Sequence, residues 1–97
     1  MGKRFKLGRL VATAAVADCA MKDHTFAAFV SKSVRLYENG DWGQTCKEDK
    51  QQNDHAVENG ERILAVYEQA GVKEPMKIWI ITEWDRSVTT ILFPEEY

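Results

Sequence analysis

The chain has 97 residues, 44% of them hydrophobic and 29% charged, and its formal net charge at pH 7 is −2. A chain of this length holds one domain with one modest core, and its composition is unlike that of a disordered protein. The slight acidic excess also differs from the basic excess of proteins that neutralise nucleic-acid phosphates, so a single globular domain over residues 1–97 is expected, with nucleic acid disfavoured as a partner.

Membrane, metal and cofactor partners are not predicted by the sequence. It contains no run of 18 apolar residues, and its first residues show no apolar core followed by a cleavage site, so a cytoplasmic protein is expected. Cys19 and Cys46 lie far apart, with no CxxC pair and no histidine at ligand spacing. Both cysteines are interpreted as small core residues, with no metal site, disulfide or cofactor.

The N-terminal part predicts a strand followed by a helix. Residues 5–12 mix apolar and basic side chains with partial alternation, which is typical of a strand at an edge or on one face of a sheet. Thr13 is a good N-cap residue, and the alanine-rich segment 14–22 behind it has high helix propensity.

A second helix is predicted to begin at Asp23 or Thr25 and to end at Asn39-Gly40, two residue types that tolerate the left-handed conformation. Its apolar residues recur at three- and four-residue spacing and therefore share one side. They are Phe26, Phe29, Val30, Val34 and Tyr37.

A third helix is expected on the surface of the domain. Thr45 and Glu48 form a capping-box pattern at its start, and segment 47–59 is strongly polar. Asn53 lies on the inner side of this helix and is expected to hydrogen-bond the loop formed by residues 41–44.

The C-terminal third predicts three strands. Residues 62–67 are apolar enough for a central strand, while residues 76–82 and 87–93 are rich in β-branched and aromatic types and flank a tight turn at 83–86. The expected fold class is α+β, in the order β-α-α-α-β-β-β. Its C-terminal antiparallel three-strand meander is expected to pack on the helices.

The last two strands are apolar on both faces. Ile78 and Ile80 alternate with Trp79 and Ile81, and the final strand likewise lacks a polar side, so the strand at 76–82 is predicted to be central. One face of the sheet is expected to carry the helices. The other would then expose apolar side chains unless a loop or a second copy covers it, which makes a homo-oligomer a hypothesis.

Glu83, Trp84, Asp85 and Arg86 form the principal candidate site. Two carboxylates, an indole and a guanidinium in one turn could act as a recognition tip or an acid/base pair. The structural alternative is that Asp85 caps the turn and Arg86 pairs with a nearby carboxylate. Trp42 is a second candidate for partner binding, with packing on the core as the favoured role.

Two other functions follow from other residues. The basic positions Lys3, Arg4, Lys6 and Arg9 suggest a nucleic-acid-associated regulator. The carboxylates of the 83–86 turn suggest a small enzyme.

Several segments resemble a family of small proteins of unknown function, labelled "plasmid-related", that bacterial plasmids and other mobile elements carry. The similar segments are residues 41–43, 60–64, 77–83, 85–87, 89–92 and 94–97. The resemblance implies a mobile-element setting and no catalytic residues. The leading hypothesis is therefore a non-enzymatic protein-interaction module, for instance an inhibitor or modulator of a host factor of the anti-restriction or anti-CRISPR type, with a protein partner.

Overall fold

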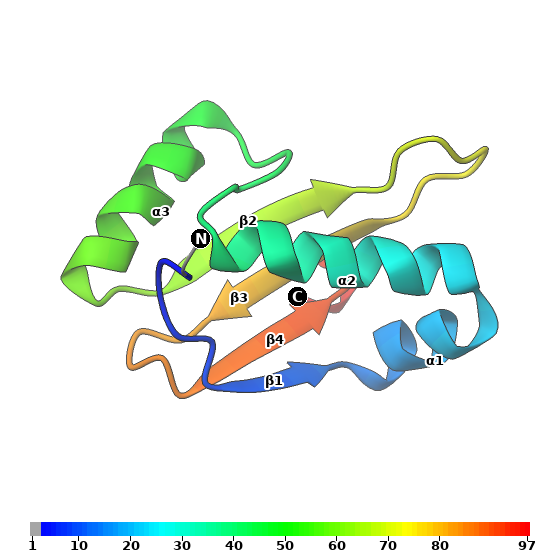
Figure 1. The fold of residues 1–97 in the computed structure, drawn as a ribbon, viewed down its shortest axis with the longest axis horizontal. Coiled ribbons are helices and arrows are strands. Elements are labelled where there is room, and N and C mark those ends of the chain that lie inside the picture. The colour runs from blue at the N-terminus through cyan, green and yellow to red at the C-terminus, as the bar shows by residue number, and fades with distance from the viewer. Residues whose placement is uncertain (1–2) are drawn as a thin grey trace.

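The order of helices and strands agrees with the sequence prediction. A computed structural model describes residues 3–97, and within them the fold is α+β, with three α-helices and a four-stranded sheet (Figure 1). The elements are β1 (Arg9–Ala12), α1 (Ala14–Lys22), α2 (His24–Glu38), α3 (Lys47–Asn59), β2 (Ile63–Glu68), β3 (Lys77–Thr82), β4 (Val88–Leu92) and the 3-10 turn η1 (Pro94–Glu96).

The sheet has the strand order β1-β4-β3-β2. Strands β2, β3 and β4 form the predicted antiparallel meander, in which Ile80 pairs with Ala65 on one side and Ile91 on the other. Strand β1 joins the free side of β4 in parallel orientation. The central position of β3 is confirmed.

The prediction of a central β2 was wrong, because β2 is an edge strand. Its apolar residues reflect the environment of its two faces, since Ile63, Ala65 and Tyr67 are buried and Leu64 and Val66 are half-buried, and neither requires a strand at the free edge. Residues of the loop before α3 lie along this edge, where Gln44 N–H donates to the Val66 carbonyl at 2.8 Å. The backbone groups at the edge are thus satisfied without a fifth strand.

The first strand is shorter than predicted, because residues 3–8 leave the plane of the sheet. Gly8 has a φ of 66°, and a Cβ there would collide with the Arg86 carbonyl. Only glycine tolerates both the left-handed conformation and this close approach. The preceding residues run toward the helices, where the Phe5 ring packs against the rings of Tyr37 and Trp42 at centroid distances of 5.3 and 6.0 Å.

Helix α2 crosses one face of the sheet, with α1 at one end and α3 beside β2 (Figure 1). Two of the predicted N-caps are confirmed: Thr13 Oγ1 accepts from Val16 N–H at 3.2 Å, and Asp23 Oδ1 accepts from Phe26 N–H at 3.1 Å. The core between helices and sheet is made of Val16, Phe26, Tyr37, Trp42, Ala56, Ile63, Ala65, Tyr67, Ile78, Ile80, Ile91 and Phe93.

The predicted capping box of α3 is absent from the structure. The N-cap is Cys46, which is exposed and therefore not the core residue that was expected, whereas Cys19 is half-buried against the core. Thr45 is buried instead. Its hydroxyl donates to the Trp42 carbonyl at 2.6 Å and accepts from Val66 N–H at 2.8 Å, so tertiary contacts with β2 outcompete the local cap.

A chain of three buried hydroxyl groups crosses the core. Tyr37 Oη lies 2.7 Å from Thr82 Oγ1, which lies 2.7 Å from Thr89 Oγ1, and Thr89 donates to the Leu7 carbonyl at 2.7 Å. Each hydroxyl has one proton. Since Thr89 uses its proton on Leu7, Thr82 must donate to Thr89, and Tyr37 must donate to Thr82. The chain thus has one direction and fastens the segment before β1 to the core.

None of the helices in residues 3–97 has both the length and the apolar character needed to cross a membrane.

Candidate functional site

The turn between β3 and β4 is held by its own residues. Arg86 N–H donates to the Glu83 carbonyl at 2.9 Å, and Arg86 has a φ of 61°, a conformation that is uncommon outside glycine. Asp85 Oδ1 accepts from Ser87 N–H at 3.0 Å, as predicted for a turn-capping aspartate. Hydrogen bonds from the side chain and the backbone of Ser87 hold the pKa of Asp85 below its ordinary value.

The Arg86 side chain fastens this turn to the end of α3. Its guanidinium donates to the carbonyls of Ala56 at 2.7 Å and Glu61 at 2.6 Å, and also to the carbonyls of Glu83 and Trp84 within the turn. The prediction that Arg86 pairs with a carboxylate was therefore wrong. The Ala56 carbonyl also accepts from Glu61 N–H at 3.1 Å. Carbonyls near a helix C-terminus carry partial negative charge, so a cation with several donors is stabilised there without a carboxylate.

Trp84 is the exposed residue of the turn, with 66% of its surface accessible. Glu83, one position earlier, is half-buried and faces Arg62, with the Nε and Oε2 atoms 3.8 Å apart. The two carboxylates of the turn thus engage different groups, since Asp85 bonds the Ser87 backbone. This arrangement presents an indole on a fixed support.

Trp42 lies in the core and not beside the turn. It is 4% exposed, packs against Tyr37 at a centroid distance of 5.6 Å, and donates from Nε1 to Asp54 Oδ1 at 2.9 Å. The hydrogen bond from Trp42, followed by that from Arg4, lowers the pKa of Asp54. The packed interpretation of Trp42 is confirmed.

The four basic N-terminal residues have different environments in the structure. Lys3 pairs with Glu38 at 3.2 Å, and Arg4 pairs with Asp54 at 3.0 Å. Lys6 and Arg9 are exposed. Two of the four charges thus have anionic partners on α2 and α3.

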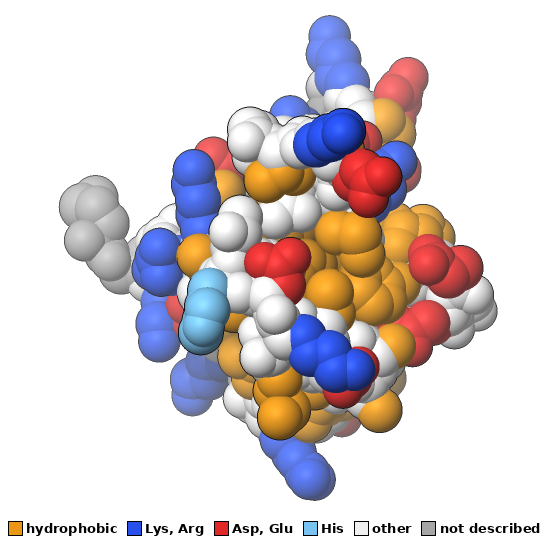
Figure 2. All heavy atoms as spheres, turned by 90° about the vertical axis from the view of Figure 1, so that its right-hand side faces the viewer, with side chains coloured by type: hydrophobic (Ala, Val, Ile, Leu, Met, Phe, Trp, Pro, Cys, Tyr) orange, Lys and Arg blue, Asp and Glu red, His pale blue; other side chains and the backbone are white. Residues whose placement is uncertain are grey.

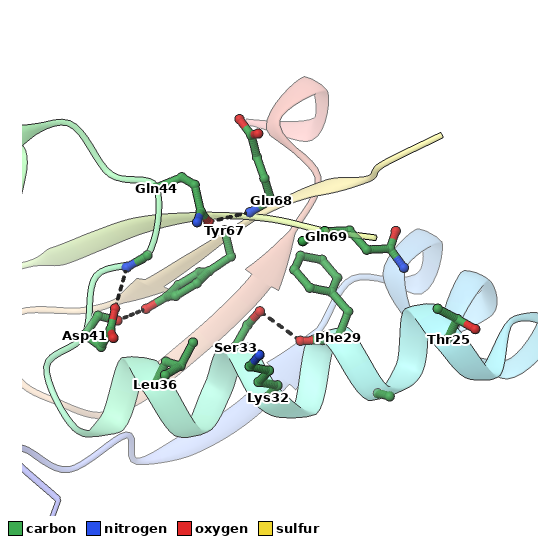
Figure 3. Close-up of a pocket in the computed structure, with 13 residues that line it drawn as sticks. Thr25, Phe29, Lys32, Ser33, Leu36, Asp41, Gln44, Tyr67, Glu68 and Gln69 are labelled. Carbon is green, nitrogen blue, oxygen red and sulfur yellow. Dashed lines mark hydrogen bonds between the residues drawn. The ribbon is translucent and has the colours of Figure 1, made fainter. Parts of the chain in front are cut away.

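A groove that the sequence did not reveal lies between α2 and the end of β2 (Figure 3). It encloses about 470 Å³, and Phe29, Leu36 and Tyr67 supply apolar surface. Ser33 donates to the Phe29 carbonyl and Tyr67 to the Asp41 carbonyl, so these two hydroxyl groups are used within the protein. The groove joins segments far apart in sequence, and the residues carry no motif that would have indicated it.

Comparison with known proteins gives no assignment, because no family model, curated protein or solved structure matches the chain. Between residues 3 and 97, the histidine, cysteine and acidic side chains form no group of three or more that could hold a metal ion.

Proposed function

We propose that this chain is a non-enzymatic protein-interaction module in which Trp84 anchors a protein partner. The supporting observation is the 66% exposure of this indole on a turn that Arg86 ties to α3. The resemblance to plasmid-related proteins supports a setting on a mobile element, in which the protein acts as an inhibitor or modulator of a host factor.

A binding residue on a rigid turn costs little free energy to order. Tryptophan is enriched among the residues that dominate binding energy, because it buries a large area at a small loss of side-chain freedom. A turn that is already rigid loses little backbone freedom on binding. Since Arg86 and Asp85 hold the backbone of the turn, the backbone at Trp84 is already ordered before a partner arrives, and only the side chain loses freedom on binding.

The neighbouring charges indicate the chemistry of the partner surface. Glu83 and Asp85 flank Trp84 in the sequence, and Asp85 is exposed. A partner with an apolar pocket bordered by lysine or arginine would complement both the indole and these carboxylates.

The test is affinity capture from host lysate, followed by titration with the purified captured protein. A partner should bind the wild type and Met21→Ala with equal affinity, because Met21 is also an exposed hydrophobic residue, at 83%, but lies on α1. Trp84→Ala should weaken binding about thirtyfold, the loss typical of a dominant interface residue. Equal binding by the wild type and Trp84→Ala would contradict the proposal.

A further inference from the structure

We propose that a second copy of this chain packs on the open face of the sheet to form a two-fold symmetric dimer. The open face consists of the side chains that point away from α2, together with Tyr97: Val11, Leu64, Val66, Trp79, Ile81, Val88, Thr90 and Leu92, with Arg9 on its β1 side. This inference does not use Trp84, although Glu83 borders both surfaces, and it does not depend on the proposed function.

The open face retains apolar surface that a partner can cover. Leu64, Val66 and Trp79 on β2 and β3 are half-buried, whereas Ile81 and Leu92 are already buried within the protein. The Tyr97 ring lies 5.1 Å from the Trp79 ring and is itself 64% exposed. Figure 2, which views the end of the molecule at the right of Figure 1, shows a patch of hydrophobic side chains at this end. Apolar surfaces of this kind usually mark a contact with another protein.

Two ion pairs between β2 and β3 border this surface. At one end Arg62 faces Glu83 at 3.8 Å, and at the other Lys77 faces Glu68 at 3.3 Å. The Glu68 side chain points away from α2 (Figure 3). Along the chain, β2 begins beside positive Arg62 and ends at negative Glu68, and β3 begins at positive Lys77 and ends beside negative Glu83. Because the two strands are antiparallel, a positive residue of one strand lies beside a negative residue of the other at each end. The four charges thus alternate in sign around the apolar centre.

This alternation makes the surface complementary to itself. A two-fold axis parallel to the strands, between β2 and β3, brings Arg62 opposite the partner's Glu83 and Glu68 opposite the partner's Lys77. An in-plane axis perpendicular to the strands brings Arg62 opposite the partner's Glu68. Opposite charges meet in both cases. A two-fold interface requires a surface that matches itself, and the β2–β3 part of the open face does so in both charge and apolar character, which selects a second copy as the occupant.

The test measures mass and dissociation constant by sedimentation over a wide concentration range. The wild type should approach twice the monomer mass of 11.1 kDa. Val66→Glu places a carboxylate on the apolar centre and should weaken the dimer about a hundredfold or more, as expected for a buried unpaired charge. Met21→Glu, the same charge added at an exposed site on α1, should leave the dissociation constant unchanged.

A charge reversal tests the border of the surface separately, in case Val66→Glu disturbs the fold. Lys77→Glu should weaken the dimer about tenfold, because like charges then meet twice across a two-fold axis. Its matched control is Lys22→Glu, which breaks the exposed pair with Asp18 on α1 and should have no effect. Reversing the signs of Arg62, Glu68, Lys77 and Glu83 together should restore the wild-type constant.

A monomeric wild type at high concentration would overturn the inference. So would a Lys77→Glu variant that dimerises like the wild type, or a fourfold reversal that remains as weak as Lys77→Glu. Trp84→Ala should dimerise normally, which separates this result from the test of the proposed function.

Discussion

The carboxamide of Asn53 forms two hydrogen bonds with the backbone of Leu64, donating from Nδ2 to the carbonyl at 2.9 Å and accepting at Oδ1 from the N–H at 3.3 Å. An adjacent strand would make the same pair of bonds. Gln44 continues the pattern, since its Oε1 accepts from Glu68 N–H at 2.8 Å. The edge of β2 is thereby closed to further strands, which protects the protein from edge-to-edge aggregation.

Replacing Asn53 by alanine should lower the free energy of unfolding by about 2 kcal/mol, because two backbone groups of Leu64 lose their partners. Urea titration measures the loss. Gln52→Ala is the matched control, since Gln52 is exposed and bonds only the Glu61 side chain, and it should change stability by less than about 0.5 kcal/mol. Equal stabilities of the two variants would contradict the assigned role.

The direction of the buried hydroxyl chain predicts an order of effects. Thr89→Val leaves the Thr82 hydroxyl without an acceptor and the Leu7 carbonyl without a donor, and should cost about 2–3 kcal/mol. Tyr37→Phe removes only the first donor, and Thr82 still donates to Thr89, so the cost should be about 1 kcal/mol. Urea titrations of both variants test this order, and the reverse order would show that the chain runs the other way.

Arg86→Lys should loosen the turn although the charge is kept. An ammonium cannot span the carbonyls of Ala56 and Glu61 as the planar guanidinium does, so the expected loss is about 1–2 kcal/mol. Hydrogen exchange should become faster at the end of α3 and in the turn. If exchange changes in neither place, Arg86 does not couple them.

Stability should fall in alkaline solution because two tyrosines are buried. Burial raises the pKa of Tyr37 and of Tyr67 far above the ordinary value of 10.0. Below pH 10 the two tyrosines stay protonated in both the folded and the unfolded protein. Above pH 10 they lose their protons in the unfolded protein first, so the free energy of unfolding falls by about 1.4 kcal/mol per pH unit for each tyrosine. Urea titrations from neutral pH to above pH 10 measure this slope. Tyr37→Phe should remove about half of it, and an unchanged slope would contradict the assignment to Tyr37.

Local signals were sufficient for much of the fold. Thr13 and Asp23 cap helices as predicted, and the alternation of apolar residues around Ile80 placed β3 in the centre of the sheet. These features depend on residues within a few positions of one another. In the candidate site, the turn itself and the cap formed by Asp85 were predictable for the same reason.

Competition from backbone groups far away in the sequence explains the two side-chain contacts that were predicted wrongly. Thr45 was expected to cap α3 but bonds Val66, and Asn53 was expected to bond the loop before α3 but bonds Leu64. In both cases the preferred partner is a strand edge that has to be satisfied. A pattern in one segment cannot indicate a backbone group from another segment that will compete for the same side chain.

By itself, the sequence determined the fold class, the order of the elements and the presence of a tight turn around Trp84, because periodicity and turn chemistry act over short distances. Only the tertiary structure decided that Arg86 binds the end of α3, that Trp42 is buried and Trp84 exposed, and that four charges alternate around the open face. Those outcomes depend on which distant segments meet, and the strand register and core packing of the whole chain set that.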